Sequence, residues 1–313
     1  IFSRKSIVSA EKGIGYALGD KGYAKAKIRA KTTTNEKRHT VFIHFMVTPG
    51  RRVYVRYITF SGNSHTDDNA FRRVLTQMEG GIISTRHLAN SKQRLMQQAY
   101  VQHVDETTTP VPGKSNEEDI NYKVATYPAG EVRMGVGYGD VDGIMVNAAI
   151  SQKNFFGTGN QFGISASWSK ASINLGANYF NPYYTAWGVG RGFNVYATRV
   201  NADKQNIADF ATNNYGAAMN YSFPIALHDS LQLGVGLDYL YLKLSGSPST
   251  TMAAFKKKHG ANFTQVLLNA GWTHNNLNAA VFPTKGLAQT LSMTFSVPMG
   301  RNGLQYYTAD YNL

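Results

Sequence analysis

The sequence predicts an α+β fold, with small β-α-α-β-β modules followed by an antiparallel transmembrane β-barrel. Residues 1–127 carry 20 Lys and Arg and 11 Asp and Glu, and helical and strand periodicities alternate there. Residues 128–313 carry only 12 and 8 such residues and repeat short alternating strands. No run of 18 apolar residues occurs. A membrane can therefore be crossed only by a closed sheet, because lipid cannot satisfy free backbone groups.

The N-terminal part contains one partial and one complete set of elements. Residues 6–23 have helical periodicity and lead into strands at 24–34 and 40–48. The complete set is a strand at 54–60, a helix capped by Thr66 or Asp67 that carries Phe71, Val74, Leu75 and Met78, a second helix at 85–100, and strands at 102–109 and 119–126. Residues 1–50 are thus predicted to be the C-terminal part of a first module, and 53–127 a complete second one.

Residues 130–313 are predicted to form about ten barrel strands. Along the first of them, Val132, Met134, Val136 and Tyr138 alternate with Arg133, Gly135, Gly137 and Gly139. A soluble β-sandwich would also alternate. Aromatic residues at strand ends, such as Trp168 and Tyr241, and long polar segments at 201–213 and 245–262 opposed by short turns favour the barrel.

Composition and motifs point away from several functions. The chain has no cysteine, which leaves out disulfides and cysteine-bound zinc. The net charge of +13 is dispersed, so we expect no nucleic-acid partner. Neither an H-E-x-x-H string, a G-x-S-x-G string nor a phosphate-binding glycine loop with its lysine occurs, so we expect no enzyme, no cofactor and no metal. A barrel enzyme with a Ser/His pair distant in sequence stays open as an alternative.

Several strings resemble a known family. They are VRYITFSGN (55–63), QMEG (77–80), GVGYG (135–139), NFFGTG (154–159), NPYY (181–184) and FPTKG (282–286). By these strings the chain resembles the BamA family of outer-membrane protein assembly factors, whose periplasmic modules are called POTRA domains. The resemblance implies part of POTRA 4, a complete POTRA 5 and the first ten of sixteen barrel strands, so we expect a truncated chain. Arg191 to Phe193 resemble the V-R-G-F loop of the family by chance only, because that loop follows a later strand.

The resemblance also implies location, function and partners. We expect the Gram-negative outer membrane with the N-terminal domains in the periplasm, and assembly and insertion of β-barrel proteins. Unfolded outer-membrane proteins would dock on POTRA sheet edges, and accessory lipoproteins and outer-membrane lipid, including lipopolysaccharide, would be further partners. A POTRA-barrel secretion pore or a TamA-like translocation and assembly factor is the alternative.

Two sets of residues are candidate sites. The first strand would act as a weak seam that pairs with substrate strands, through Val132, Met134, Gly135, Val136, Gly137, Tyr138 and Gly139. The glycines would equally serve to relieve crowding in a narrow lumen. Glu79 resembles a position where the family contacts a partner lipoprotein, and its simpler interpretation is a solvated turn carboxylate. Lys256 to Lys258 would be a solvated loop or a site for lipopolysaccharide phosphates.

Overall fold

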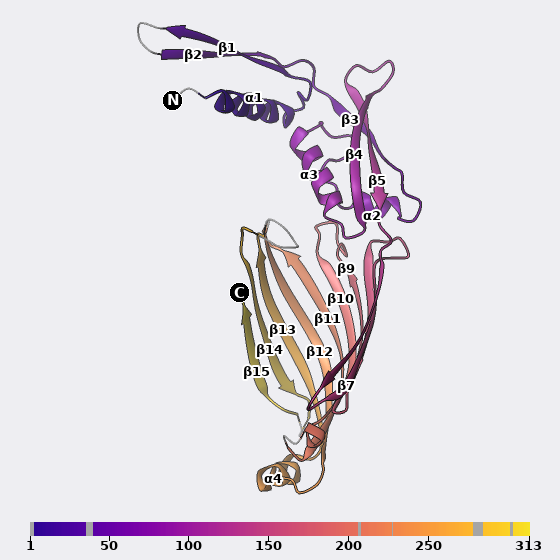
Figure 1. Ribbon diagram of the computed structural model, residues 1–313. Coiled ribbons are helices and arrows are strands. Elements are labelled where there is room, and N and C mark those ends of the chain that lie inside the picture. Colours follow the sequence, from indigo (N-terminus) through magenta and orange to yellow (C-terminus); the bar gives the residue numbers. More distant parts are fainter. Residues whose placement is uncertain (1–2, 36–39, 206–207, 227, 278–283, 301–302) are drawn as a thin grey trace. The chain divides into compact units, whose positions relative to one another are not determined.

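The computed structural model describes residues 3–35, 40–205, 208–226, 228–277, 284–300 and 303–313. The chain forms two compact units, Ile1–Ala129 and Gly130–Leu313 (Figure 1). None of the described helices is both long and apolar enough to span a membrane. Phe282 and Pro283 of the predicted hairpin string lie outside the described residues.

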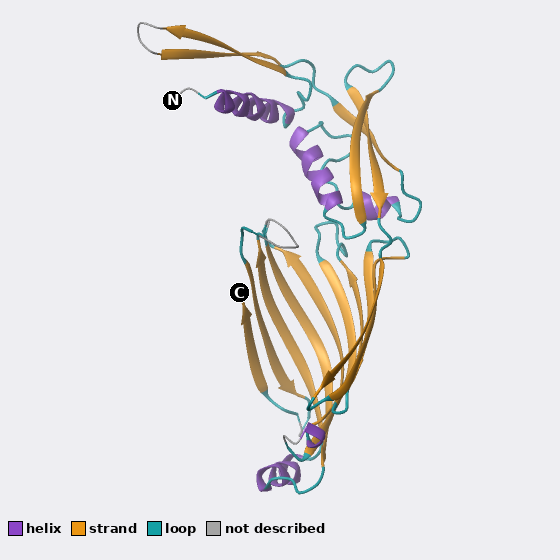
Figure 2. Cartoon of the chain, in the orientation of Figure 1, coloured by secondary structure: helices purple, strands orange, loops and turns teal. Residues whose placement is uncertain are grey.

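The first unit begins with a helix on a two-stranded sheet (Figure 2). Helix α1 (Arg4–Gly19) lies against strand β1 (Lys27–Asn35), which pairs antiparallel with β2 (Thr40–Thr48). The carboxylate of Glu11 joins helix to strand, because its Oε1 accepts a hydrogen bond of 2.7 Å from the Ala30 amide. The helix-hairpin order predicted from the sequence is confirmed.

The rest of this unit is a β-α-α-β-β module. Its elements are β3 (Tyr54–Ser61), α2 (Asp68–Arg72), α3 (Thr85–Met96), β4 (Val101–Pro110) and β5 (Glu117–Thr126). The sheet order is β3-β5-β4, with β3 parallel and β4 antiparallel to the central strand. Its core is apolar and almost fully inaccessible to solvent, and includes Ile58, Phe71, Leu95, Val104, Ile120 and Tyr122. Burial of these side chains is the main term that stabilises a module of this size.

The first helix of the module is shorter than the sequence pattern predicts. It ends at Arg72, so Val74, Leu75 and Met78 are not on a helix, and Met78 is 71% exposed. The reason is tertiary: Ser91 Oγ on α3 accepts hydrogen bonds from the amides of Thr76 (3.0 Å) and Gln77 (3.2 Å). These donors are held to α3 and cannot continue a helical ladder. Helix α3 likewise ends at Met96, before the predicted Tyr100.

The second unit is one sheet of ten antiparallel strands in sequential order (Figure 1). The strands are β6 (Gly130–Gly139), β7 (Gly143–Phe155), β8 (Asn160–Trp168), β9 (Ser172–Asn181), β10 (Gly190–Asn201), β11 (Phe210–Pro224), β12 (Asp229–Leu244), β13 (Asn262–Asn275), β14 (Ala288–Pro298) and β15 (Tyr306–Asn312). The predicted number of strands is confirmed. Within the described part of the chain, β6 and β15 are the two edges of the sheet.

A helix interrupts one predicted loop. Residues 245–262 were expected to form a polar connection, but α4 (Thr250–His259) lies within them (Figure 2). Ser249 caps this helix by accepting a hydrogen bond from the Met252 amide. Lys256, Lys257 and Lys258 therefore occupy its last turn, where cations interact favourably with the helix dipole.

Candidate functional site

The predicted seam is the edge strand β6. All ten of its residues pair with β7, from Gly130 opposite Gln152 to Gly139 opposite Gly143. On the other side of β6 the described residues provide no ladder partner. Alternate amide and carbonyl groups along this side are therefore available to another extended strand.

The four large apolar residues of β6 share one face and are exposed. The exposed fractions are 67% for Val132, 84% for Met134, 78% for Val136 and 74% for Tyr138. The register joins this face to the other strands: Val132 lies opposite Ile150, which lies opposite Ile164. Because paired residues point to the same side of a sheet, this is one continuous apolar face. In a barrel it is the side that contacts lipid.

The glycines of β6 meet little crowding among the described residues. A Cβ placed on Gly135 would meet no atom within 4 Å, and at Gly137 and Gly139 it would meet only the Met145 Cε, at 3.5 and 3.6 Å. Such distances are ordinary van der Waals contacts with a flexible side chain. Among the described residues the glycines therefore relieve no clash and add no side-chain contact between strands.

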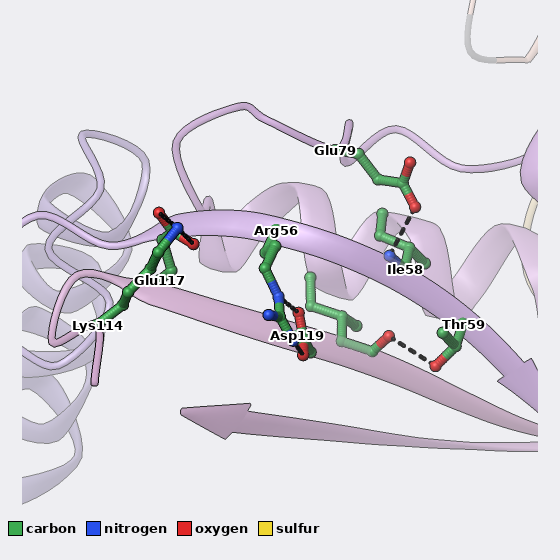
Figure 3. A network of polar contacts seen from close by, with 8 residues as sticks. Arg56, Ile58, Thr59, Glu79, Lys114, Glu117 and Asp119 are labelled. Atoms are coloured by element: carbon green, nitrogen blue, oxygen red, sulfur yellow. Dashed lines mark hydrogen bonds and ion pairs between the residues drawn. The ribbon is translucent and has the colours of Figure 1, made fainter. Parts of the chain in front are cut away.

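Glu79 is not a freely solvated turn carboxylate. Its Oε1 accepts hydrogen bonds from the Ile58 amide on β3 (2.7 Å) and from Arg72 Nη1 (2.8 Å), while Arg72 Nη2 donates to the Ile58 carbonyl (2.9 Å). Figure 3 shows the Glu79 carboxylate pointing at this amide. The two side chains together form hydrogen bonds with both the amide and the carbonyl of Ile58 on the outer edge of β3. We call this arrangement the Glu79–Arg72 clamp.

The clamp lowers the pKa of Glu79. The hydrogen bond from the Ile58 amide is the main cause, and partial burial opposes it, while Arg72 adds to the lowering through its hydrogen bond and its charge. On the other side of β3, Arg56 pairs with Asp119 on β5 and lowers the pKa of that carboxyl, chiefly by hydrogen bonding (Figure 3). The side chains around β3 are thus ionised and hydrogen-bonded at neutral pH.

The segment after Glu79 covers the same edge of β3. The Val55 amide donates to the Gly81 carbonyl (2.9 Å) and the Val55 carbonyl accepts from the Gly80 amide (2.7 Å). The Ile83 amide donates to the Val53 carbonyl (3.0 Å). From Val53 to Ile58 the outward backbone groups of β3 thus form hydrogen bonds with other residues of the same module.

Strand β4 is the other edge of this sheet. The Val111 amide just beyond it donates to the Glu117 carbonyl at 3.1 Å. Because hydrogen-bonded pairs alternate along an antiparallel ladder, Thr109 and Thr107 direct their backbone groups to β5, and Thr108 and Glu106 direct theirs away. The described residues provide no strand partner on that outer side. The module therefore presents β4, and not β3, as its exposed edge.

Sequence reasoning missed Arg72 and the buried polar groups of the barrel sheet. Asp238 is 2% exposed and accepts hydrogen bonds from the Tyr196 hydroxyl (2.5 Å) and from Gln265 Nε2 (3.0 Å). Arg72 precedes Glu79 by seven residues, and Asp238 follows Tyr196 by 42. No sequence motif connects such positions. Among the described residues no group of three or more His, Cys, Asp or Glu is arranged to hold a metal ion.

Comparison with known proteins places this architecture in a family. The model described as the Omp85 superfamily domain matches residues 154–313, and the POTRA model, described as surface antigen variable number repeat, matches residues 53–126. This chain belongs to the Omp85 superfamily. Like other Omp85 proteins with POTRA modules, it is located in the bacterial outer membrane, with its POTRA region in the periplasm, as the sequence predicted.

Individual relatives agree with this assignment of an Omp85 protein. The outer membrane protein assembly factor BamA of Neisseria meningitidis serogroup B is 29% identical over 321 residues, which cover 99% of this chain and 40% of that protein. The crystal structure of BamA from Haemophilus ducreyi lacking POTRA domains 1–3 is 32% identical with a TM-score of 0.77, and the match covers 99% of this chain and 60% of that one. CdiB from Acinetobacter baumannii is 14% identical with a TM-score of 0.55, covering 99% of this chain and 56% of that one, a likeness of fold alone.

Proposed function

We propose that this protein takes part in assembling and inserting β-barrel proteins into the outer membrane, with β6 as the strand on which a client strand forms. The observation that carries the proposal is the side-chain pattern of β6, where Gly135, Gly137 and Gly139 offer a neighbouring strand no side chain to pack against. The chain spans 40% of the first curated relative, an outer membrane protein assembly factor, and the match to that relative supports the same function.

The physical basis is exchange of backbone hydrogen bonds. A client strand in the membrane must satisfy its amides and carbonyls, since each unpaired group costs several kcal/mol in hydrocarbon. The edge of β6 offers complementary groups, and the glycines at positions 135, 137 and 139 reduce the side-chain contacts that would fix a permanent partner. Further strands of a longer protein would pair with the same edge. The proposal requires only that this pairing be weak enough to exchange.

Periplasmic docking of clients is assigned to β4. An extended client can add to this edge through backbone hydrogen bonds, which make little demand on client sequence. The edge of β3 is excluded from this role, because Glu79, Arg72 and the 80–83 segment occupy it. Low sequence specificity suits a protein that receives many different clients.

Glu79 remains the candidate contact for a partner lipoprotein. Only its Oε1 is used by the clamp, and its side chain is 38% exposed beside the exposed Met78. A cationic partner group can therefore approach the second carboxylate oxygen without breaking the clamp. A charge at such a rim acts mainly on orientation and association rate.

Site-specific photo-crosslinking tests the seam. A photoreactive residue replaces Val136 in the full-length protein, in cells that are synthesising other outer-membrane barrels. The matched control replaces Leu237, which is 56% exposed on the same face but lies on β12, a strand paired on both sides. We expect adducts between nascent barrel proteins and position 136, and few from position 237.

Comparison of the adducts from positions 136 and 237 separates strand pairing from random collision. Equal capture of nascent barrels from both positions would indicate collisions in the membrane and would refute the seam. The assembly function would be refuted by two results together: position 136 captures only lipid and the protein's own strands, and other barrels assemble normally when the protein is depleted. The likeness to CdiB concerns the fold, so no specific observation favours the alternative of a secretion pore.

A further inference from the structure

A cavity at the outer end of the barrel sheet is lined by cations. Strand β6 begins directly after the periplasmic unit in sequence, and the strands then alternate in direction. The turn between β8 and β9 and the connection between β10 and β11 therefore lie at the opposite end, facing the outer leaflet. There a cavity of about 270 Å³ is lined by Trp168, Lys170, Ile173, Arg199 and Lys204, together with Ser169, Ala171, Ser172 and Asn201.

Part of this cavity lies on the lipid-facing side. Trp168 pairs with Ile173, and Ile173 pairs with Arg199. In the other direction Trp168 pairs with Val146, which pairs with Val136 of the exposed apolar face. Because paired residues share a face, the indole and the guanidinium flank Ile173, one on each side, on the face that contacts lipid and near the ends of their strands.

The cavity wall is held in place by backbone hydrogen bonds. The Ser169 amide donates to the Ser172 carbonyl (2.7 Å), and Ser169 Oγ accepts from the Ser172 amide (3.0 Å). The Lys170 amide donates to the Asp142 carbonyl (3.0 Å), and the Asn201 amide donates to the Ala171 carbonyl (2.7 Å). The turn that carries Lys170 is thus tied to the turns on both sides of it, while the Lys170 side chain is exposed.

No carboxylate among the described residues forms an ion pair with Lys170, Arg199 or Lys204, the cations that line the cavity. A cation on the lipid face is strongly unfavourable at the bilayer midplane and nearly neutral at the interface. An arginine in this position is therefore suited to the level of the headgroups, where tryptophan also concentrates.

We propose that this cavity binds the phosphate-bearing headgroup of an outer-leaflet lipid. The three cations contact phosphate oxygens, with the guanidinium of Arg199 able to bind two of them at once. Trp168 and Ile173 form the apolar side of the cavity and pack against the first part of an acyl chain, which a free phosphate ion lacks. The site depends on the outer-membrane location and is independent of the proposed assembly function.

Lipid binding to two charge variants tests the site. The full-length protein in dodecyl maltoside, a detergent without phosphate, is titrated with fluorescent lipid A that carries two phosphates. One variant combines Lys170→Gln, Arg199→Gln and Lys204→Gln. The control combines Lys256→Gln, Lys257→Gln and Lys258→Gln, which removes the same charge from α4 at the same end of the sheet and thereby tests the other predicted position for lipopolysaccharide phosphates. At about 1 kcal/mol for each cation near an anionic lipid, we expect roughly 100-fold weaker binding for the first variant and less than about threefold for the control.

Further measurements distinguish a lipid phosphate from a free phosphate ion, and loss of charge from loss of folding. A variant with Lys170→Arg, Arg199→Lys and Lys204→Arg keeps the charges and is expected to bind lipid A within about threefold of the native protein. Lipid A without phosphates should bind as weakly to the native protein as the phosphorylated lipid binds to the first variant. Equal loss in the first variant and the control, or undiminished binding of the dephosphorylated lipid, would overturn the proposal. Displacement of lipid A by inorganic phosphate at equal concentration would overturn it in favour of a free-ion site.

Discussion

Replacing Glu79 by alanine removes the acceptor that closes the edge of β3. The Ile58 residue is 2% exposed, and its amide donates to Glu79 Oε1 at 2.7 Å. A hydrogen bond to a charged group contributes about 1.5 to 3 kcal/mol net, whereas the ion pair with Arg72, whose partners are 40% and 38% exposed, contributes about 0 to 1. We expect the substitution to cost about 2 kcal/mol of local stability at β3.

Hydrogen exchange at the Ile58 amide measures this cost in the full-length protein. At about 1.4 kcal/mol for each factor of ten, the loss corresponds to exchange roughly 30 times faster. Glu79→Gln keeps an acceptor oxygen and should show an increase of only about fivefold. The matched control is Glu117→Ala, which removes a surface pair with Lys114 (2.9 Å) on the same sheet and should change exchange at Ile58 by no more than about twofold.

The same clamp gives a pH dependence of defined sign. Because the pKa of Glu79 is lower in the folded protein than its unfolded value of about 4.3, the clamp stabilises the fold fully above that value. This contribution is lost as the pH falls through the lowered, folded pKa. Native protein should therefore show faster exchange at Ile58 in that acidic window, after correction for the intrinsic rate, and Glu79→Ala should show no such step. An unchanged exchange rate in Glu79→Ala at neutral pH, with the module still folded, would refute the clamp.

Two further predictions concern the exposed edge and the barrel interior. Thr108→Pro removes an amide that points away from β5, so we expect it to reduce crosslinking of unfolded clients to β4 severalfold while the module stays folded. Thr107→Pro breaks the ladder to β5 and should instead unfold the module. Undiminished crosslinking in Thr108→Pro would refute docking on β4. Asp238→Leu leaves the Tyr196 hydroxyl and Gln265 amide without their buried acceptor, so we expect a loss of about 2 to 4 kcal/mol and a lower Tm of the barrel. Asp310→Leu on the exposed strand β15 is the control, and equal Tm values for the two variants would show that the buried acceptor contributes nothing.

The strands of the second unit could be predicted from the sequence because the signal is local. Side chains alternate between the two faces with a period of two, so a face made of Leu231, Leu233 and Val235 is visible without any knowledge of the partner strand. Helix α4 was also within reach of prediction: Ser249 is a capping residue, basic residues fill the last turn and Gly260 follows it. Its position between two strands led to its interpretation as a loop.

The clamp and the cationic cavity could not be predicted in the same way. Helix α2 ends at Arg72 because Ser91, far along the chain, binds the amides of Thr76 and Gln77, and this end leaves the Arg72 side chain beside Ile58. Likewise Trp168 and Arg199 come to lie on either side of Ile173 only through the register of β8, β9 and β10. A shift of one residue in either pairing would place the guanidinium on the opposite face of the sheet. Both arrangements depend on tertiary hydrogen bonds that leave no periodic trace in the sequence.

The edges of the two sheets differ in how they are protected, and this difference supports the proposed route of a client. An uncovered edge strand is a general hazard, because it pairs with any extended chain. In the POTRA module one edge is closed by a carboxylate, a guanidinium and a backbone segment, whereas β4 is left open with Pro110 at its end. In the barrel sheet β6 carries glycines where nothing in the described structure demands them. The specific protection of β3, the lack of a strand partner for β4 among the described residues and the glycines of β6 together support strand exchange at β4 and β6.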